Sequence, residues 1–308
     1  MTTTHLALVG PTAAGKSRLA LAVAARLGDV EIVSVDSMQV YRGLDIGTAK
    51  PTPAERARVP HHLVDVADPS EQWSVARFQR AARAAVAEIE ARGRRALLVG
   101  GTGLYVQAVV DDLRFPGEDL ELRAELEAWT AEPGGVAAAH AELTARDPVA
   151  AARIDPHNAR RIVRALEVIR LTGQPFSSFG PGLGHFGPTA FPVRMAGVWL
   201  PRGVVGTRIS ARFAAMRAGG LVDEVRRLAA GNGGLSRTAR QAIGYKEVLA
   251  HLEGAEPSLD AALDTAVRRT RSFARRQRMW FRRDPRIAWF AATNPASVEP
   301  ALLASWSR

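Results

Sequence analysis

The sequence contains no cysteine, so disulfide bonds and thiolate metal ligands are both excluded. No stretch approaches the roughly 18 consecutive apolar residues that a membrane helix requires, and we therefore expect no membrane partner. The opening residues, MTTTHLALVG, lack the charged start and the long apolar run of an export signal. Together these absences predict a soluble protein of the reducing cytoplasm.

Lysine is scarce, although the chain is strongly basic. Of its 41 lysines and arginines only Lys16, Lys50 and Lys246 are lysines, and the formal net charge is +10. Such a charge favours a polyanionic partner, although arginine-rich coding bias would also produce it. In a chain that uses arginine almost everywhere, a lysine indicates a position that needs a compact ammonium rather than a planar guanidinium.

Residues 8–20, LVGPTAAGKSRLA, contain a pattern that is typical of phosphate binding. An apolar run precedes the loop and helical periodicity follows it as far as Gly28, so the strand–loop–helix context of G-x-x-x-x-G-K-[ST] is complete. Backbone amides and the positive end of the helix would hold the anion, Lys16 would reach its outer oxygens, and the Ser17 hydroxyl could bind Mg²⁺. The predicted phosphate-binding residues are Gly10, Pro11, Thr12, Ala13, Ala14, Gly15, Lys16 and Ser17.

The other apolar runs indicate the fold class. Five of them read as short strands: EIVSVD, HHLVDV, RALLVG, RMAGVWL and RIAWF. Helical segments such as residues 74–91 alternate with them, which predicts an α/β, P-loop NTPase-like core with a mostly parallel sheet flanked by helices. Ligands of such sheets collect at the carboxyl ends of the strands, where Gly10, Asp36 and Gly100 would lie.

The composition changes in the middle of the chain. Residues 119–172 have helix-like spacing without β-rich runs, and residues 173–192 are rich in glycine, proline, phenylalanine and serine. We therefore expect a helical insertion domain at residues 116–190. It would interrupt a catalytic core that is formed by residues 1–115 and 191–308 and that carries basic helices near its C-terminus.

Two further segments would join the phosphate loop at this edge of the sheet. Asp36 follows an apolar strand, and three roles are open to it: a Walker-B ligand of Mg²⁺, a general base, or a turn residue. Thr102, in the glycine turn of residues 100–103, offers a hydroxyl. The polar, aromatic and basic residues after Asp36 argue against a motor ATPase, as does the lack of a second apolar strand that ends in Asp-Glu.

Two helical segments concentrate the basic charge. In the first, Arg160, Arg161 and Arg164 lie near one helical face, opposite Ile162. Residues 268–283 contain eight arginines and no acidic residue. Five of these form one stripe on a helical wheel: Arg268, Arg271, Arg275, Arg278 and Arg282. We expect the opposite, more aromatic side to pack on the core and the stripe to face phosphates, although an isolated charge run is usually a solvated surface.

In their order along the chain, these segments resemble the tRNA dimethylallyltransferases, almost from end to end. The blocks that carry the resemblance are GPTAAGKS, DSMQVYRGLDIGTAKP, HHLVDV, GGTGLY, DPVAAARIDPHNARRIVRALEVIRLTG, RISARFAAM, QAIGYKEVLAHLEG and RRQRMWFRR. Members of this family move a dimethylallyl group from its diphosphate to N6 of the adenosine 3′ of the anticodon, in tRNAs that read codons beginning with U. The departures are small: Ala14, Asp155 and Ala159 stand where serine, histidine and a polar residue are more common.

The resemblance implies a role for each segment. The phosphate loop would hold dimethylallyl diphosphate rather than ATP, with Arg212 assisting it and Mg²⁺ bound through Ser17. Asp36 would act as the general base and Thr102 would supply a second hydrogen bond. The implied partner is the tRNA anticodon stem-loop, and we expect a monomer because the RNA provides the second large surface. The implied tRNA contacts are Asp36, Ser37, Met38, Gln39, Thr102, Arg123, Arg160, Arg161, Ile162, Val163, Arg164, Gln241, Tyr245, Lys246, Arg275, Arg276 and Arg278.

Other functions remain open from the residues alone. A small P-loop kinase would account for the first 110 residues but not for the arginine-rich segment or the insertion. An adenylate isopentenyltransferase would use the same donor on a free nucleotide without needing an extended basic surface. A pure RNA-binding module would have no use for the phosphate loop. For Tyr245, a place at the buried start of a helix is as well supported as contact with RNA.

Overall fold

The computed structural model describes residues 3–111, 113–180 and 182–307. By packing, the chain divides into two units. The first comprises residues 1–112 and 186–308, and the second comprises residues 113–185. These limits lie a few residues before the expected limits of the insertion, at both its start and its end.

The first unit is built on a six-stranded sheet with the order β3-β2-β4-β1-β5-β6. Its strands are β1 (His5–Val9), β2 (Val30–Val35), β3 (His61–His62), β4 (Arg95–Gly100), β5 (Val193–Trp199) and β6 (Ile287–Ala291). All neighbouring strands pair in parallel. This arrangement confirms the predicted α/β, P-loop type of fold, and it puts the ends of β2, β4 and β1 next to one another.

The prediction of a strand from HHLVDV is correct for the first two residues and wrong for the rest. β3 contains only His61 and His62, which pair with Ile32 and Val33 of β2. The chain then leaves the sheet because Leu63 and Asp65 both have φ 60°. This left-handed conformation is incompatible with an extended strand.

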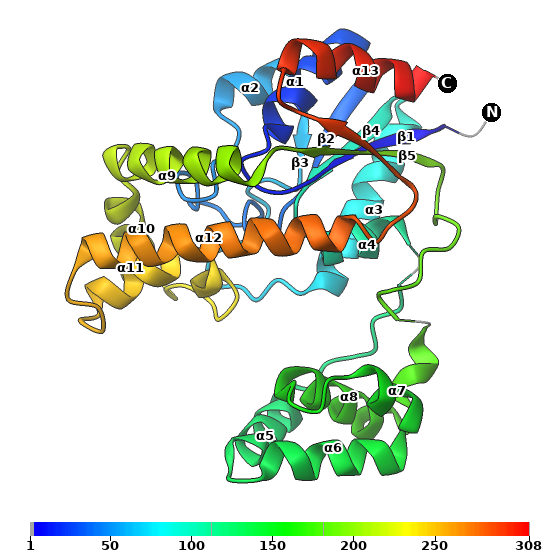
Figure 1. Ribbon diagram of the computed structural model, residues 1–308, viewed down its shortest axis with the longest axis vertical. Coiled ribbons are helices and arrows are strands. Elements are labelled where there is room, and N and C mark those ends of the chain that lie inside the picture. The colour runs from blue at the N-terminus through cyan, green and yellow to red at the C-terminus, as the bar shows by residue number, and fades with distance from the viewer. Residues whose placement is uncertain (1–2, 112, 181, 308) are drawn as a thin grey trace. The chain divides into compact units, whose positions relative to one another are not determined.

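Helices cover both faces of the sheet in Figure 1, with α1 and α13 on one face and α3 and α4 on the other. The helices that follow β1 to β4 are α1 (Lys16–Leu27), α2 (Pro53–Arg58), α3 (Val75–Ala91) and α4 (Gly103–Val110). Those that follow β5 are α9 (Arg202–Ala218), α10 (Leu221–Ala230), α11 (Tyr245–Leu252), α12 (Leu259–Phe281) and α13 (Pro295–Ser307), with the short 3₁₀ turn η2 (Ala239–Gln241) before α11. β1 is buried along its whole length, as expected for the centre of such a sheet.

The second unit is helical and has its own apolar core. It contains α5 (Leu120–Ala131), α6 (Gly135–Arg146), α7 (Pro148–Arg153), α8 (Ala159–Thr172) and the 3₁₀ turn η1 (Phe176–Phe179). Leu126, Leu143 and Leu166 are almost fully buried in its core, which is separate from that of the first unit. α8 ends at Gly173, whose φ of 70° suits a glycine at a helix C-terminus.

The long helix α12 has the two-sided character that its sequence predicts. Ala266, Ala274 and Phe281 lie on its buried side, and Arg268, Arg275 and Arg282 of the stripe are exposed.

Within the described residues, none of the helices has the length and apolar character needed to cross a membrane.

Candidate active site

The phosphate-binding loop joins β1 to α1 in a tightly constrained turn. Gly10, Ala13 and Gly15 all have positive φ, at 143°, 62° and 94°. A Cβ on Gly10 would lie 2.3 Å from the carbonyl oxygen of Val198 in β5, so only glycine fits there. The loop therefore wraps around the N-terminus of α1, where backbone N–H groups and the helix dipole favour an anion.

The ammonium of Lys16 folds back over this loop. Its Nζ donates a hydrogen bond to the carbonyl oxygen of Pro11 at 2.8 Å. Desolvation, together with the nearby Arg212, lowers the pKa of Lys16 to about 8, against the opposing effect of the Asp36 carboxylate. A poorly solvated cation of this kind is ready to pair with an anion that enters the loop.

Two arginines reach the same loop from α9. Arg212 donates from Nη1 to the hydroxyl oxygen of Thr12 at 3.2 Å, and Arg208 donates from Nη1 to the carbonyl oxygen of Ala13 at 3.4 Å. Burial lowers the pKa of Arg212, and Asp36 partly offsets that effect. Sequence reasoning named Arg212 but missed Arg208, although their spacing of four residues on a helix is the signal that would have found it.

Asp36 begins the loop that follows β2. Its Oδ1 accepts hydrogen bonds from the backbone N–H groups of Met38, at 2.8 Å, and Gln39, at 3.3 Å. The carboxylate lies near the phosphate loop, since its charge raises the pKa of both Lys16 and Arg212 against the effect of burial. Asp36 therefore has the turn role that was one of its three alternatives, and its position leaves the other two roles open.

The loop of residues 37–50 is held in place by buried side chains. Glu224 of α10 accepts hydrogen bonds from the backbone N–H groups of Asp45, Ile46 and Gly47, at distances from 2.9 to 3.3 Å. The Tyr245 hydroxyl donates to the same carboxylate. Both Glu224 and Tyr245 are almost fully buried.

Two polar side chains inside the loop, the buried Lys50 and the partly exposed Gln39, add to this support. Lys50 donates to the carbonyl oxygen of Tyr41 at 2.8 Å and to the carboxylates of Asp45 and Asp65 at 2.6 Å each. Gln39 accepts a hydrogen bond from the Ser34 hydroxyl at 2.8 Å. The loop is therefore a preformed surface.

The turn after β4 lies between the other two segments, because β4 separates β1 from β2 in the sheet. Thr102 is the N-cap residue of α4, but its side chain makes no capping hydrogen bond. The hydroxyl is thus not committed to the helix end. The phosphate loop, Asp36 and Thr102 occupy the carboxyl ends of three adjacent strands, as the sequence predicts.

The expected RNA contacts divide by accessibility. Four of them are partly exposed beside the site: Ser37, Met38, Gln39 and Thr102. Six others are exposed: Arg160, Arg161, Gln241, Lys246, Arg275 and Arg276. Gln241, Lys246 and Arg276 line a groove of about 480 Å³ between α11 and α12, together with Arg268 and Arg269. In this groove Lys246 donates to the side-chain oxygen of Gln241 at 2.9 Å.

Three other residues among the expected tRNA contacts have buried side chains. Ile162 and Val163 lie in the core of the second unit, 0% and 3% exposed, because they occupy the apolar side of α8. Tyr245 is 0% exposed, and burial beside Glu224 raises the pKa of its hydroxyl. The side chains of these residues support the fold, whereas their neighbours Arg161 and Lys246 remain accessible.

Three other expected contacts already have protein partners. Arg123 and Arg164 both pair with Glu167, a fully buried acid of α8, at 2.9 Å. Arg278 is partly exposed and holds its guanidinium 5.0 Å from the centre of the Trp199 ring. Any contact these arginines make with RNA has to be shared with those partners.

A phosphate loop on a parallel sheet, with cations from a second helix and a carboxylate at the same edge of the sheet, defines a P-loop protein whose site is organised around an anionic group. The model of the IPP transferase family matches residues 39–284, and that of isopentenyl transferase matches residues 3–65. The chain belongs to the IPP transferase family.

Relatives and solved structures of similar sequence agree with this assignment. The chain is 51% identical to a tRNA dimethylallyltransferase of Kineococcus radiotolerans, over 97% of this chain and 93% of that protein. It is 52% identical to one of Salinispora arenicola, over 98% and 86%. The full-length tRNA isopentenylpyrophosphate transferase of Bacillus halodurans superimposes with a TM-score of 0.71 at 41% identity, covering 99% and 97% of the chains. A eukaryotic dimethylallyltransferase acting on tRNA gives 0.79 at 25% identity, covering 98% and 78%.

Proposed function

We propose that the protein transfers the dimethylallyl group of dimethylallyl diphosphate to N6 of the adenosine 3′ of the anticodon in tRNAs that read codons beginning with U. The observation that carries this proposal is the order β2-β4-β1, which brings Asp36, Thr102 and the phosphate loop to one edge of the sheet. An anion-binding loop at the end of β1 and a carboxylate at the end of β2, with only β4 between these strands, suit a donor with a diphosphate leaving group and an acceptor that must lose a proton.

The donor side would stabilise the departing diphosphate. Breaking the allylic C–O bond builds positive character on carbon and negative charge on the diphosphate oxygens. Fixed hydrogen-bond donors aimed at those oxygens lower the barrier, because their attraction grows as the charge develops. The loop amides, Lys16, Arg212 and also Arg208 are the groups in position to do this.

The residues present fit a magnesium ion. Ser17, in the first turn of α1, offers a hydroxyl at the end of the phosphate loop. Mg²⁺ prefers such oxygen ligands, is usually held by one or two protein groups, and completes its shell with water and phosphate oxygens. Among the described residues there is no cluster of three or more acidic or histidine side chains, so a fully protein-made site is not expected. When bound, the ion would neutralise charge on the diphosphate.

The acceptor side would use Asp36 and Thr102. The exocyclic nitrogen of adenine is a poor nucleophile because its lone pair is shared with the ring. As its lone pair forms the new bond to the allylic carbon, the C–O bond breaks and one N–H proton passes to the Asp36 carboxylate. General-base assistance of this type is worth about 10²- to 10⁴-fold. The Thr102 hydroxyl, free of the helix cap, would orient the reacting groups.

The exposed arginines and the basic groove would hold the RNA backbone. Arg268 and Arg276 line the α12 side of the groove and Lys246 lines its α11 side, while Arg275 is exposed on α12. Phosphate contacts of this kind fix the position of an RNA, whereas the target base has to leave its stack to reach Asp36. We expect the protein to act as a monomer on an anticodon stem-loop.

The test is transfer of label from dimethylallyl diphosphate in the presence of Mg²⁺ and tRNA, AMP or ATP. Label in tRNA, at the adenosine 3′ of the anticodon, is the expected result. Label in AMP would identify an adenylate isopentenyltransferase instead. Transfer of phosphate from ATP without transfer of label would identify a kinase. A tRNA in which that adenosine is replaced by guanosine is the matched control and should accept no label.

A further inference from the structure

Gln277 of α12 lies between two loops of the active site. Its Oε1 accepts a hydrogen bond from the backbone N–H of Thr12 at 2.8 Å, and its Nε2 donates to the carbonyl oxygen of Gly101 at 2.9 Å. Only 6% of the residue is exposed. One side-chain amide thus joins the phosphate-binding loop to the turn that carries Thr102.

The two partners of Gln277 require a side chain with both a donor and an acceptor. An amide has both, whereas an apolar or acidic side chain of the same length does not. Thr12 presents a donor and Gly101 an acceptor, and glutamine offers one group of each kind. Methionine would leave both backbone groups without this partner, and glutamate would place a carboxylate against a carbonyl oxygen. Because an unpaired buried polar group costs free energy, a glutamine at this site is a specific choice.

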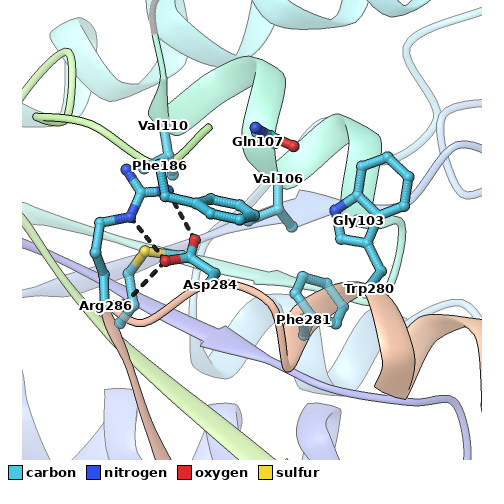
Figure 2. A pocket seen from close by; sticks show the side chains of 10 residues that line it. Gly103, Val106, Gln107, Val110, Phe186, Trp280, Phe281, Asp284 and Arg286 are labelled. Carbon is cyan, nitrogen blue, oxygen red and sulfur yellow. Dashed lines mark hydrogen bonds and ion pairs between the residues drawn. The ribbon is translucent and has the colours of Figure 1, made fainter. Parts of the chain in front are cut away.

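Close packing fixes α12 against the turn. A Cβ on Gly101 would lie 2.5 Å from Nε2 of Gln277, and a Cβ on Gly103 would lie 2.3 Å from Cδ1 of Trp280. Figure 2 shows Trp280 beside Gly103, at the start of α4. The helix therefore meets the turn at two points about one helical turn apart, and it cannot shift without moving the loops.

We propose that Gln277 is a positioning residue for the transfer reaction, setting the separation between the diphosphate site and Thr102. The inference rests on the proposed function. Thr12 also accepts the hydrogen bond of Arg212, so a displaced Thr12 carries a donor-side cation with it. A misplacement of about 1 Å between reacting groups can cost about 100-fold in rate.

The test compares kcat and the KM for tRNA of the full-length protein and the variants Gln277→Met and Gln277→Glu with dimethylallyl diphosphate and tRNA. Gln79→Met is the matched control, because the Gln79 amide also donates to a backbone carbonyl, that of Ala108 at 2.7 Å, but on α3 and away from the loops. Thermal unfolding and tRNA affinity are measured for each variant. Gln277→Glu keeps the acceptor for Thr12 and serves if Gln277→Met does not fold.

We expect both Gln277 variants to lose at least about tenfold in kcat, with the KM and Kd for tRNA within about twofold of the original values. Gln79→Met should change the melting temperature but not kcat. A folded Gln277 variant with normal kcat would overturn the inference, as would a loss confined to the KM for tRNA or an equal loss in Gln79→Met. A wild-type protein that transfers no label to any acceptor would instead overturn the proposed function.

Discussion

Raising the pH above 8 should weaken the use of dimethylallyl diphosphate by removing a proton from Lys16. Desolvation and Arg212 together lower the pKa of this ammonium from 10.5 to about 8, against the opposing effect of Asp36. The protonated form can pair with the diphosphate and the neutral form cannot. The value of kcat/KM for the donor should therefore fall about tenfold for each pH unit above 8, since one pKa unit is about 1.4 kcal/mol.

The lowered pKa of Lys16 has the opposite effect on stability, because it makes the free energy of unfolding rise with pH. Between pH 8 and 10.5 the unfolded chain still binds the proton that the folded protein has lost. Stability rises with pH wherever the unfolded state binds more protons, so the contribution of Lys16 to the free energy of unfolding increases through this window. Its desolvation penalty is fully present below pH 8, where the donor is bound best. Donor use and this contribution to stability therefore change in opposite senses.

The assay is kcat/KM for dimethylallyl diphosphate at saturating tRNA, between pH 7 and pH 10 at constant ionic strength. Lys16→Arg is the control, because a guanidinium stays charged throughout this range and the ionisation of the donor is common to both proteins. The variant should have a lower but flatter profile. Equal slopes in the two proteins, or no fall in the original protein up to pH 9.5, would refute the assignment of Lys16 to the diphosphate.

Three further results are expected. Asp36→Asn preserves the Oδ1 acceptor of the turn but cannot take a proton, so single-turnover rates should fall at least about 100-fold while tRNA affinity holds; near-normal turnover would remove Asp36 from the mechanism. Log affinity for a single-stranded anticodon loop should fall with log salt by about 0.7 per phosphate contact, and Arg275→Ala with Arg276→Ala should reduce that slope; unchanged slopes in a filter-binding titration would contradict the RNA surface. Glu224→Gln should lower the free energy of unfolding by about 1–3 kcal/mol, because it weakens several hydrogen bonds to one buried acid. An unchanged midpoint of urea unfolding would show that these hydrogen bonds contribute nothing.

The features that sequence predicted well are local in the chain. The phosphate loop lies between a strand and a helix within about 20 residues, and the ends of α1 and α8 are signalled by Gly28 and Gly173. The two faces of α12 follow from helical periodicity alone. Such features depend on neighbours in sequence, so a single sequence contains the information.

The features it missed depend on contacts between distant segments. Gln277 and Thr12 are 265 residues apart, and Glu224 holds backbone groups almost 180 residues away. No local spacing marks either residue, and within an arginine-rich run a glutamine reads as one more polar surface residue. A resemblance over a whole block placed Ile162 and Tyr245 among the expected tRNA contacts, and both side chains are buried, which for Tyr245 was the alternative left open.

The anchoring of residues 37–50 by Glu224 and Lys50 has a thermodynamic consequence for encounter with substrate. A loop in which a buried acid already binds three backbone amides has little conformational freedom left to lose. The entropy of ordering it is spent when the chain folds and not when the nucleic acid arrives. A larger share of the contact energy with the incoming base is therefore left for extruding that base from its stack.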